Sequence, residues 1–116
     1  MTLITLLTKT SLDMSLNRNE LKYSIQEFFN DVIEQGFHHL VNYPQSDNEL
    51  SVIIKEATEE LNYQVLKLDS HNFAGNSKEL EQHYEQISRD SQQKSLELLG
   101  QLQKIQQRDI PRLKRI

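Results

Sequence analysis

Cysteine and tryptophan are absent from this 116-residue chain, and glycine and proline occur only three and two times. Without a thiol, the chain can form no disulfide, no thiolate zinc site and no redox-active dithiol. Its glycines stand at positions 36, 75 and 100, too far apart for a phosphate-binding or dinucleotide-binding loop. No Gly-x-Ser-x-Gly elbow or other local nucleophile signature is present. We therefore expect a protein that is not an enzyme and binds no cofactor.

Apolar residues are also scarce, since they make up 36% of the chain and aromatic residues only 7%. Globular domains usually contain about 45–50% apolar residues when glycine is counted among them. A chain of this length has room for one domain. A thin core suits an elongated helical bundle or an oligomer better than a compact globule.

The formal net charge is −4, but the charges are unevenly distributed. Residues 20–60 contain nine acidic and two basic residues, whereas residues 108–116 contain four basic and one acidic residue. The acidic body argues against nucleic acid as a partner, and we expect the four basic residues to lie in a solvated tail or near a helix C-terminus. The apolar run at the N-terminus is too short to span a membrane and lacks the features of a secretory signal, so we expect a cytoplasmic protein.

Two segments begin with a capping pair and continue with apolar residues at helical spacing. The first begins at Asn17, with Glu20 three residues later, and ends before Pro44. Its apolar positions are Leu21, Ile25, Phe28, Phe29, Val32, Ile33, Phe37 and Leu40. The second begins at Ser46, with Glu49 three residues later, and ends near position 69. Its apolar positions are Leu50, Ile53, Ile54, Ala57, Leu61, Val65 and Leu68.

The third segment is the longest and runs from residue 77 to residue 109. Asn76 and Glu79 form its capping pair, and Pro111 ends it. As one helix it would be about 50 Å long, longer than either preceding helix. We predict an all-α fold, an antiparallel three-helix bundle with a long C-terminal helix. Residues 17–109 form the bundle domain, residues 110–116 a basic tail, and residues 1–16 either an arm or a short helix that makes a fourth element of the bundle.

Eight consecutive polar residues at positions 88–95 interrupt the apolar stripe of the long segment. Helical spacing places Ser91, and then Lys94 or Ser95, on the buried side. Either the helix bows over a solvated gap there, or the long stems of Arg89 and Lys94 cover the stripe. The competing interpretation is that these polar residues set the register of a partner helix. Gly100 costs about 1 kcal/mol in a helix interior, so we expect it where another backbone packs closely.

Histidine is the one residue type that suggests metal chemistry. Two histidines stand four residues after a glutamate, in the pairs Glu34–His38 and Glu79–His83. Metal sites in helical bundles usually use Glu-x-x-His at spacing three instead, and Phe37 and Tyr84 fit the buried face better than the adjacent histidines. We therefore expect no metal site and interpret both pairs as surface pairs. We expect His39 and His71 at a helix cap or in a loop.

Phe73-Ala74-Gly75 lies between the second and third helical segments. It resembles a degenerate version of the Trp-x-Gly turn in the small secreted helical-hairpin proteins of bacteria. Phenylalanine replaces tryptophan, an additional helix precedes the hairpin, and no Tyr-x-x-x-Asp/Glu export signal follows it. The resemblance implies an alternative function, a secretion-related substrate or chaperone. Otherwise, Phe73 closes one end of the bundle over a glycine turn.

The leading prediction is a non-catalytic protein–protein interaction module, such as an adaptor, a regulator or a small assembly subunit, that acts through exposed helix surface. A metal-binding bundle is a weaker alternative, and no small-molecule substrate is evident. The final helix is longer than its partners, so we expect its leucine-rich second half to overhang and to bind a second copy as a homodimer. The predicted contact residues are Leu96, Leu98, Leu99, Leu102 and Ile105. The competing expectation is that residues 1–16 cover this surface.

Overall fold

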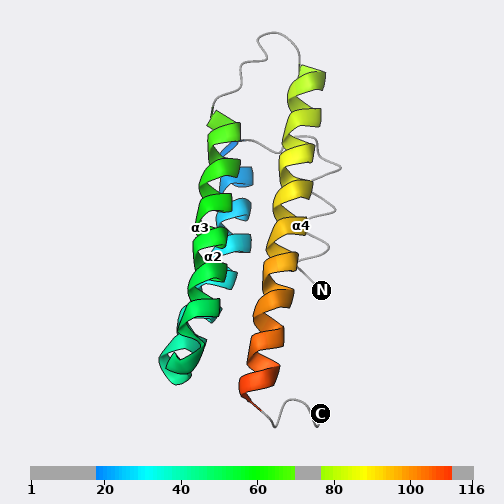
Figure 1. The fold of residues 1–116 in the computed structure, drawn as a ribbon. Helices are drawn as coiled ribbons and strands as arrows, with labels where there is room; N and C mark the ends of the chain where they lie inside the picture. The colour runs from blue at the N-terminus through cyan, green and yellow to red at the C-terminus, as the bar shows by residue number, and fades with distance from the viewer. Residues whose placement is uncertain (1–17, 70–76, 111–116) are drawn as a thin grey trace.

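The computed structural model describes residues 18–69 and 77–110, and this part of the chain forms three packed helices without a strand. The elements are α2 (Arg18–Asn42), the short 3-10 helix η1 (Pro44–Ser46), α3 (Asp47–Asp69) and α4 (Ser77–Asp109). Helix α3 runs antiparallel to α2, and α4 returns parallel to α2 (Figure 1). The predicted all-α three-helix bundle is confirmed. Predictions for residues 1–16, for the segment around Phe73 and for the tail after Ile110 lie outside the described residues.

The sharp turn between α2 and α3 follows from Pro44. Proline disfavours the helical conformation in the residue before it, and Tyr43 accordingly has φ −135° and ψ 67°. The Tyr43 N–H donates to the His39 carbonyl, and the Ser46 N–H donates to the Tyr43 carbonyl. The turn is therefore closed by backbone bonds, and α3 can start at Asp47, one residue after the predicted cap Ser46.

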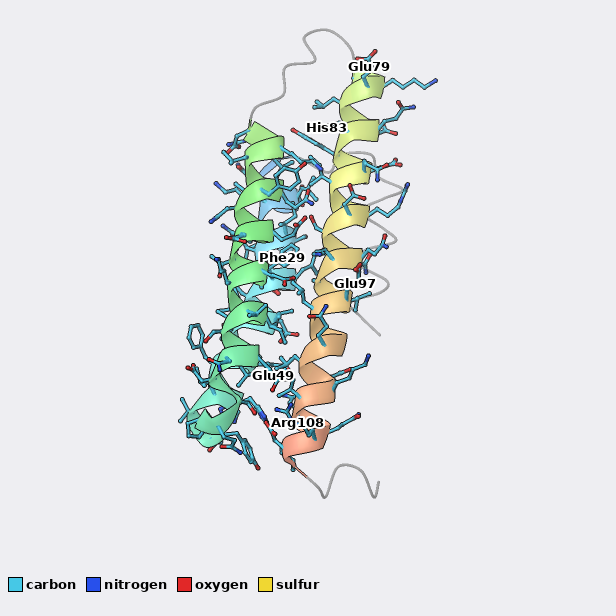
Figure 2. The ribbon with its side chains drawn as sticks, in the orientation of Figure 1. Phe29, Glu49, Glu79, His83, Glu97 and Arg108 are labelled. Atoms are coloured by element: carbon cyan, nitrogen blue, oxygen red, sulfur yellow. The ribbon has the colours of Figure 1, made fainter. Side chains whose placement is uncertain are left out.

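The core is a single cluster to which all three helices contribute. Phe29 of α2 is its largest fully buried side chain, and Figure 2 shows it midway along the bundle. The buried apolar residues are Leu21, Ile25, Phe29, Val32, Leu50, Ile53, Ala57, Leu68, Ile87, Leu98, Leu102 and Ile105. Burial of these side chains supplies most of the driving force for packing the helices together.

Helix α4 overhangs at the end opposite to the predicted one. Its second half lies along α2 and α3 and ends beside the turn between them, whereas its first turns extend beyond the end of α3 (Figure 1). Leu98 and Leu102 are fully buried, and Ile105 is nearly so. The prediction that the second half overhangs is therefore wrong. The reason is that the C-terminal end of α4 is held by polar contacts at the turn, which sequence spacing does not reveal.

Gly36 and Gly100 have different surroundings in the bundle. A Cβ atom at Gly36 would lie 2.9 Å from Cγ1 of Ile54, so this glycine allows α2 and α3 to approach closely. A Cβ atom at Gly100 would have no neighbour within 4 Å. The expectation of close backbone packing at Gly100 is wrong, and the close approach occurs at Gly36 instead.

The molecule is elongated, with principal extents of 54 × 30 × 16 Å and a radius of gyration of 16.8 Å. A compact domain of this length would have a radius of gyration of about 13 Å.

Ion pairs join neighbouring helices, with Arg18 bonded to Asp69 and Lys67 lying 3.8 Å from Asp90. None of the helices in the described ranges is both long and apolar enough to cross a membrane.

Candidate functional site

A polar cluster lies at the end of the bundle where α2, η1 and α4 meet, and Asp109 is its centre. The Asp109 side chain is only 7% exposed. Its Oδ2 atom accepts hydrogen bonds from His39 Nε2 at 2.9 Å and from the Ser46 hydroxyl at 2.5 Å. His39 belongs to the last turn of α2, Ser46 to η1 and Asp109 to the end of α4. One carboxylate oxygen therefore joins three elements.

Arg108 extends the cluster to α3. Its Nη1 lies 2.7 Å from Oε1 of Glu49, its Nη2 donates to the Ser46 hydroxyl at 2.9 Å, and its Nε donates to Asp109 Oδ1 at 3.1 Å. Figure 2 shows the Arg108 and Glu49 side chains close together at this end of the bundle. The pair with Glu49 is half exposed, so it contributes less than the buried bonds to Asp109.

The cluster favours the ionised form of Asp109. The hydrogen bond from the Ser46 hydroxyl, followed by those from His39 and Arg108, lowers the pKa of Asp109 from 3.8 to about 2, although burial alone raises it. An ionised carboxylate only accepts hydrogen bonds. The Nε2 atom of His39 must therefore carry the proton that it shares with Asp109.

Serine, histidine and aspartate meet here in an order that does not suit nucleophilic catalysis. In a catalytic triad, the histidine lies between the serine and the carboxylate and removes the serine proton. Here the carboxylate of Asp109 lies between His39 and Ser46, and the Ser46 hydroxyl donates directly to it. The arrangement therefore fits a structural role, joining α4 to the α2–α3 turn.

His39 is the cluster residue whose position was predicted wrongly. It lies in the last turn of α2 rather than in a loop, and it is 3% exposed, with its ring stacked on that of Tyr43 at 4.6 Å between centroids. Gly36 and His39 follow Val32 by four and seven residues and continue the buried face. Phe37 falls outside this face and is 52% exposed, so the prediction that it is buried is also wrong.

The two predicted glutamate–histidine pairs do not converge on a common site. His38 is exposed on α2, whereas His83 Nε2 lies 3.1 Å from the Lys67 carbonyl and points toward α3 (Figure 2). Within the described ranges, no three histidine, aspartate or glutamate side chains are grouped so that they could hold a metal ion.

The polar stretch at 88–95 packs against its own bundle. Ser91 is fully buried and Ser95 is 6% exposed, which confirms their predicted place on the buried stripe. The Ser95 hydroxyl donates to the Gln92 carbonyl, but the Ser91 hydroxyl has no hydrogen-bond partner in the part of the chain that the structure describes. The burial of both serines shows that α4 does not bow over a solvated gap here.

The predicted self-association residues divide into two groups. Leu98, Leu102 and Ile105 belong to the monomer core and present little surface to a second copy. Leu99 is partly buried against that core. Only Leu96 is well exposed, at 60%. The structure thus leaves one of the five predicted residues on an open surface, while self-association itself stays a prediction.

Most of the large exposed apolar side chains lie on α2 and α3 rather than on α4. Six of the seven belong to the hairpin, and Leu96 is the only one on α4 among the described residues. Those of the hairpin are Tyr23, Phe37, Val41, Val52, Tyr63 and Leu66. The large exposed apolar side chains of the described residues therefore lie mainly on α2 and α3, whereas the predicted contact surface was on α4.

On α2 the exposed apolar residues belong to a regular pattern. From Tyr23 onward, residues alternately three and four apart form what we call the outer seam of α2, which consists of Tyr23, Gln26, Asn30, Ile33, Phe37 and Leu40. This is the spacing of coiled-coil contact positions. Tyr23 and Phe37 are 64% and 52% exposed, and Ile33 and Leu40 are only partly buried against the core. The outer seam thus offers an incomplete apolar stripe beside the core-facing side of α2.

Acidic residues border the outer seam. Glu27 and Glu34 are exposed and stand seven residues apart, each four residues after a seam position. Glu27 is hydrogen-bonded to the Tyr23 hydroxyl, which raises the pKa of Tyr23. Residues 18–69 as a whole contain ten acidic and four basic residues, whereas α4 contains six and five. The hairpin is therefore the acidic part of the molecule.

No protein-family model matches this chain, and neither a curated protein nor a solved structure matches it. Function must consequently be inferred from the chain's own side chains. The two features that stand out are the buried cluster around Asp109, which joins α4 to the α2–α3 turn, and the outer seam of α2, which is partly exposed.

Proposed function

We propose that this protein is a non-catalytic interaction module, an adaptor, regulator or small assembly subunit that binds a protein partner through the outer seam of α2. The partner would complete the helix packing that the bundle leaves unfinished on this side. The proposal includes a cytoplasmic location, with which the absence of cysteine is compatible.

The observation that carries the proposal is the exposure of Tyr23 and Phe37 on a helix whose core-facing residues are buried. Large aromatic side chains are enriched at protein interfaces, and single scattered apolar residues would need no explanation. Here, however, the two aromatic residues share one coiled-coil pattern with Ile33 and Leu40. A repeated pattern of contact positions is what a helix-to-helix interface requires.

Site-specific photo-crosslinking in the native host cell tests the proposal. A photoreactive residue at Phe37 should attach a discrete protein partner, because this position lies within the outer seam. The same residue at Leu96 is the matched control, since Leu96 is similarly exposed but lies on α4. Crosslinks of equal yield and identity from both positions, or none from Phe37, would contradict the proposal.

Self-association through the second half of α4 does not form part of this proposal. Its strongest predicted contact residues, Leu98 and Leu102, are already used inside the monomer. If Leu98 and Leu102 contacted a second copy instead, they would leave the core and expose the apolar surface of α2 and α3 that they now cover.

A further inference from the structure

We infer that the partner of the outer seam is a basic amphipathic helix, one with apolar residues at coiled-coil spacing and lysine or arginine at its flanks. This inference rests on the proposed function and adds the chemistry of the partner. It is carried by the juxtaposition, on one exposed helix face, of the seam side chains and two flanking carboxylates.

The apolar part of the recognition comes from Tyr23, Ile33 and Phe37. Tyr23 and Phe37 are fourteen residues apart, about 21 Å along the helix. A partner helix of about 18–21 residues would therefore contact both ends of the seam. Asn30 lies midway between them, at a position where a polar residue fixes register in coiled coils. The partner should present a polar side chain at the facing position.

The charged part comes from Glu27 and Glu34, which occupy the flanking positions that select partners in coiled coils. Glu34 takes part in no ion pair among the described residues. Across an interface, complementary charges favour one partner, and like charges oppose the wrong one. Lysine or arginine residues spaced seven apart on the partner would face both carboxylates.

A second copy of the chain fits this surface less well. Two outer seams packed antiparallel about Asn30 would match Tyr23 with the neighbouring copy's Phe37, but would place Glu27 beside the neighbouring copy's Glu34. Such like-charge neighbours occur twice in a symmetric contact. The net acidity of the hairpin adds to this repulsion, because it contains six more acidic than basic residues, counted as ten against four over residues 18–69. Charge complementarity thus favours a basic partner.

Titration of the full-length protein with two designed helical peptides tests the inference. Both peptides carry the same leucine seam with one central asparagine, and they differ only in lysine or glutamate at the flanking positions. We expect the lysine peptide to bind about tenfold more tightly than the glutamate peptide, as measured by calorimetry. Equal affinities, or no binding of either peptide, would overturn the inference.

Protein variants locate the site. Phe37→Ser should weaken binding of the lysine peptide about tenfold or more, whereas Leu96→Ser should leave it unchanged. The double variant Glu27→Lys/Glu34→Lys should reverse the preference, so that the glutamate peptide binds more tightly. Such a reversal cannot result from a general attraction of cationic peptides to an acidic protein. Equal losses in Phe37→Ser and Leu96→Ser would show that binding occurs elsewhere. Circular dichroism confirms that each variant is folded.

Two further measurements test whether a second copy of the chain or residues 1–16 occupy the outer seam. Because the chain has no cysteine, Asn30→Cys introduces a single thiol at the centre of the seam. Its oxidation to a disulfide-linked dimer at micromolar concentration, with Glu97→Cys remaining monomeric, would show that a second copy occupies the seam. If the lysine peptide binds only after Leu3, Leu6 and Leu7 are changed to serine, residues 1–16 occupy the outer seam in the unmodified protein. Either result overturns the basic-partner inference, while the crosslinking result at Phe37 decides the proposed function separately.

Discussion

At the scale of single residues, Gly36 and Gly100 occur in similar helical positions but in different surroundings. Both lack a side chain within a helix, which lowers helix stability relative to alanine. Only Gly36 has a neighbour that a methyl group would strike, since a methyl carbon there would lie 2.9 Å from Cγ1 of Ile54. The two glycines therefore make a matched pair for separating helix propensity from packing.

We expect Gly100→Ala to raise the free energy of unfolding by about 1 kcal/mol, because the added methyl group meets open space. Gly36→Ala should instead lower it, because overpacking against Ile54 costs about 1–3 kcal/mol and exceeds the gain in propensity. Urea denaturation followed by circular dichroism measures both values. Equal stabilisation by the two variants would show that α2 and α3 are not in close contact at Gly36.

Ser91 provides a second test at this scale. Its hydroxyl is fully buried and has no hydrogen-bond partner among the described residues, and an unsatisfied buried polar group costs about 1–3 kcal/mol. Ser91→Ala removes that group and should stabilise the protein by about 1 kcal/mol. Ser95→Ala should stabilise the protein less than Ser91→Ala, because it also removes the hydrogen bond to the Gln92 carbonyl. A clear loss of stability in Ser91→Ala would mean that its hydroxyl is satisfied in solution.

At the scale of the element, α4 shows how one helix divides its leucines between core and surface. Leu98 and Leu102 face α2 and α3 and are fully buried, whereas Leu96 is rotated away and is 60% exposed. Successive helical residues differ by about 100° around the axis. Two residues of sequence separation are therefore enough to move a leucine from the core to solvent.

This division predicts the effects of truncating each leucine. Leu98→Ala should lower the free energy of unfolding by about 2–5 kcal/mol, since it leaves a cavity in the core. Leu96→Ala should change it by less than about 0.5 kcal/mol. Leu102→Asp should abolish most of the helical circular dichroism signal, because it buries an unpaired charge within the monomer. If the wild type is a dimer and Leu102→Asp is a folded monomer, the result would instead support the predicted self-association interface on α4.

At the scale of the whole molecule, the cluster around Asp109 joins the end of α4 to the turn between α2 and α3. It joins residues that are 70 and 63 positions apart in the chain. The bundle is elongated, and these bonds fix the end of α4 to the turn between α2 and α3. Breaking one partner of such a network leaves the others unpaired, which costs more than the bond itself contributes.

Asp109→Asn should therefore destabilise the protein at pH 6 by about 1–3 kcal/mol. The folded-state pKa of Asp109 is lowered to about 2 from 3.8, so the stability contributed by this carboxylate is fully present above the unfolded value and is lost as pH falls from about 4 to 2. The difference between wild type and variant in urea midpoint should shrink over that window. Glu97→Gln, which changes an exposed carboxylate on the same helix, serves as control. A difference that does not change with pH would contradict this role for Asp109.

Local signals were sufficient to predict the three α-helices of residues 18–69 and 77–110. Capping residues, Pro44 and Pro111, and the period of apolar residues act within a few positions of each other, so they indicate where each helix starts and ends. The observed bounds of α2, α3 and α4 agree with those expectations to within one residue, counted from the predicted caps. The same period also placed Ser91 on the buried stripe of α4.

Only the tertiary structure decided which faces of those helices meet. Whether Phe37 or His39 is buried, which end of α4 overhangs and which glycine permits close packing all depend on contacts between residues far apart in the chain. The meeting of His39, Ser46 and Asp109 has no local signature, since each is an ordinary polar residue until the helices pack. The apolar residues of α2 were predicted as a single stripe, and the sequence alone could not show that Phe29 would be buried in the bundle while Phe37 would be exposed on the outer seam. The helix period determines which residues share a face, whereas burial depends on which neighbour covers that face.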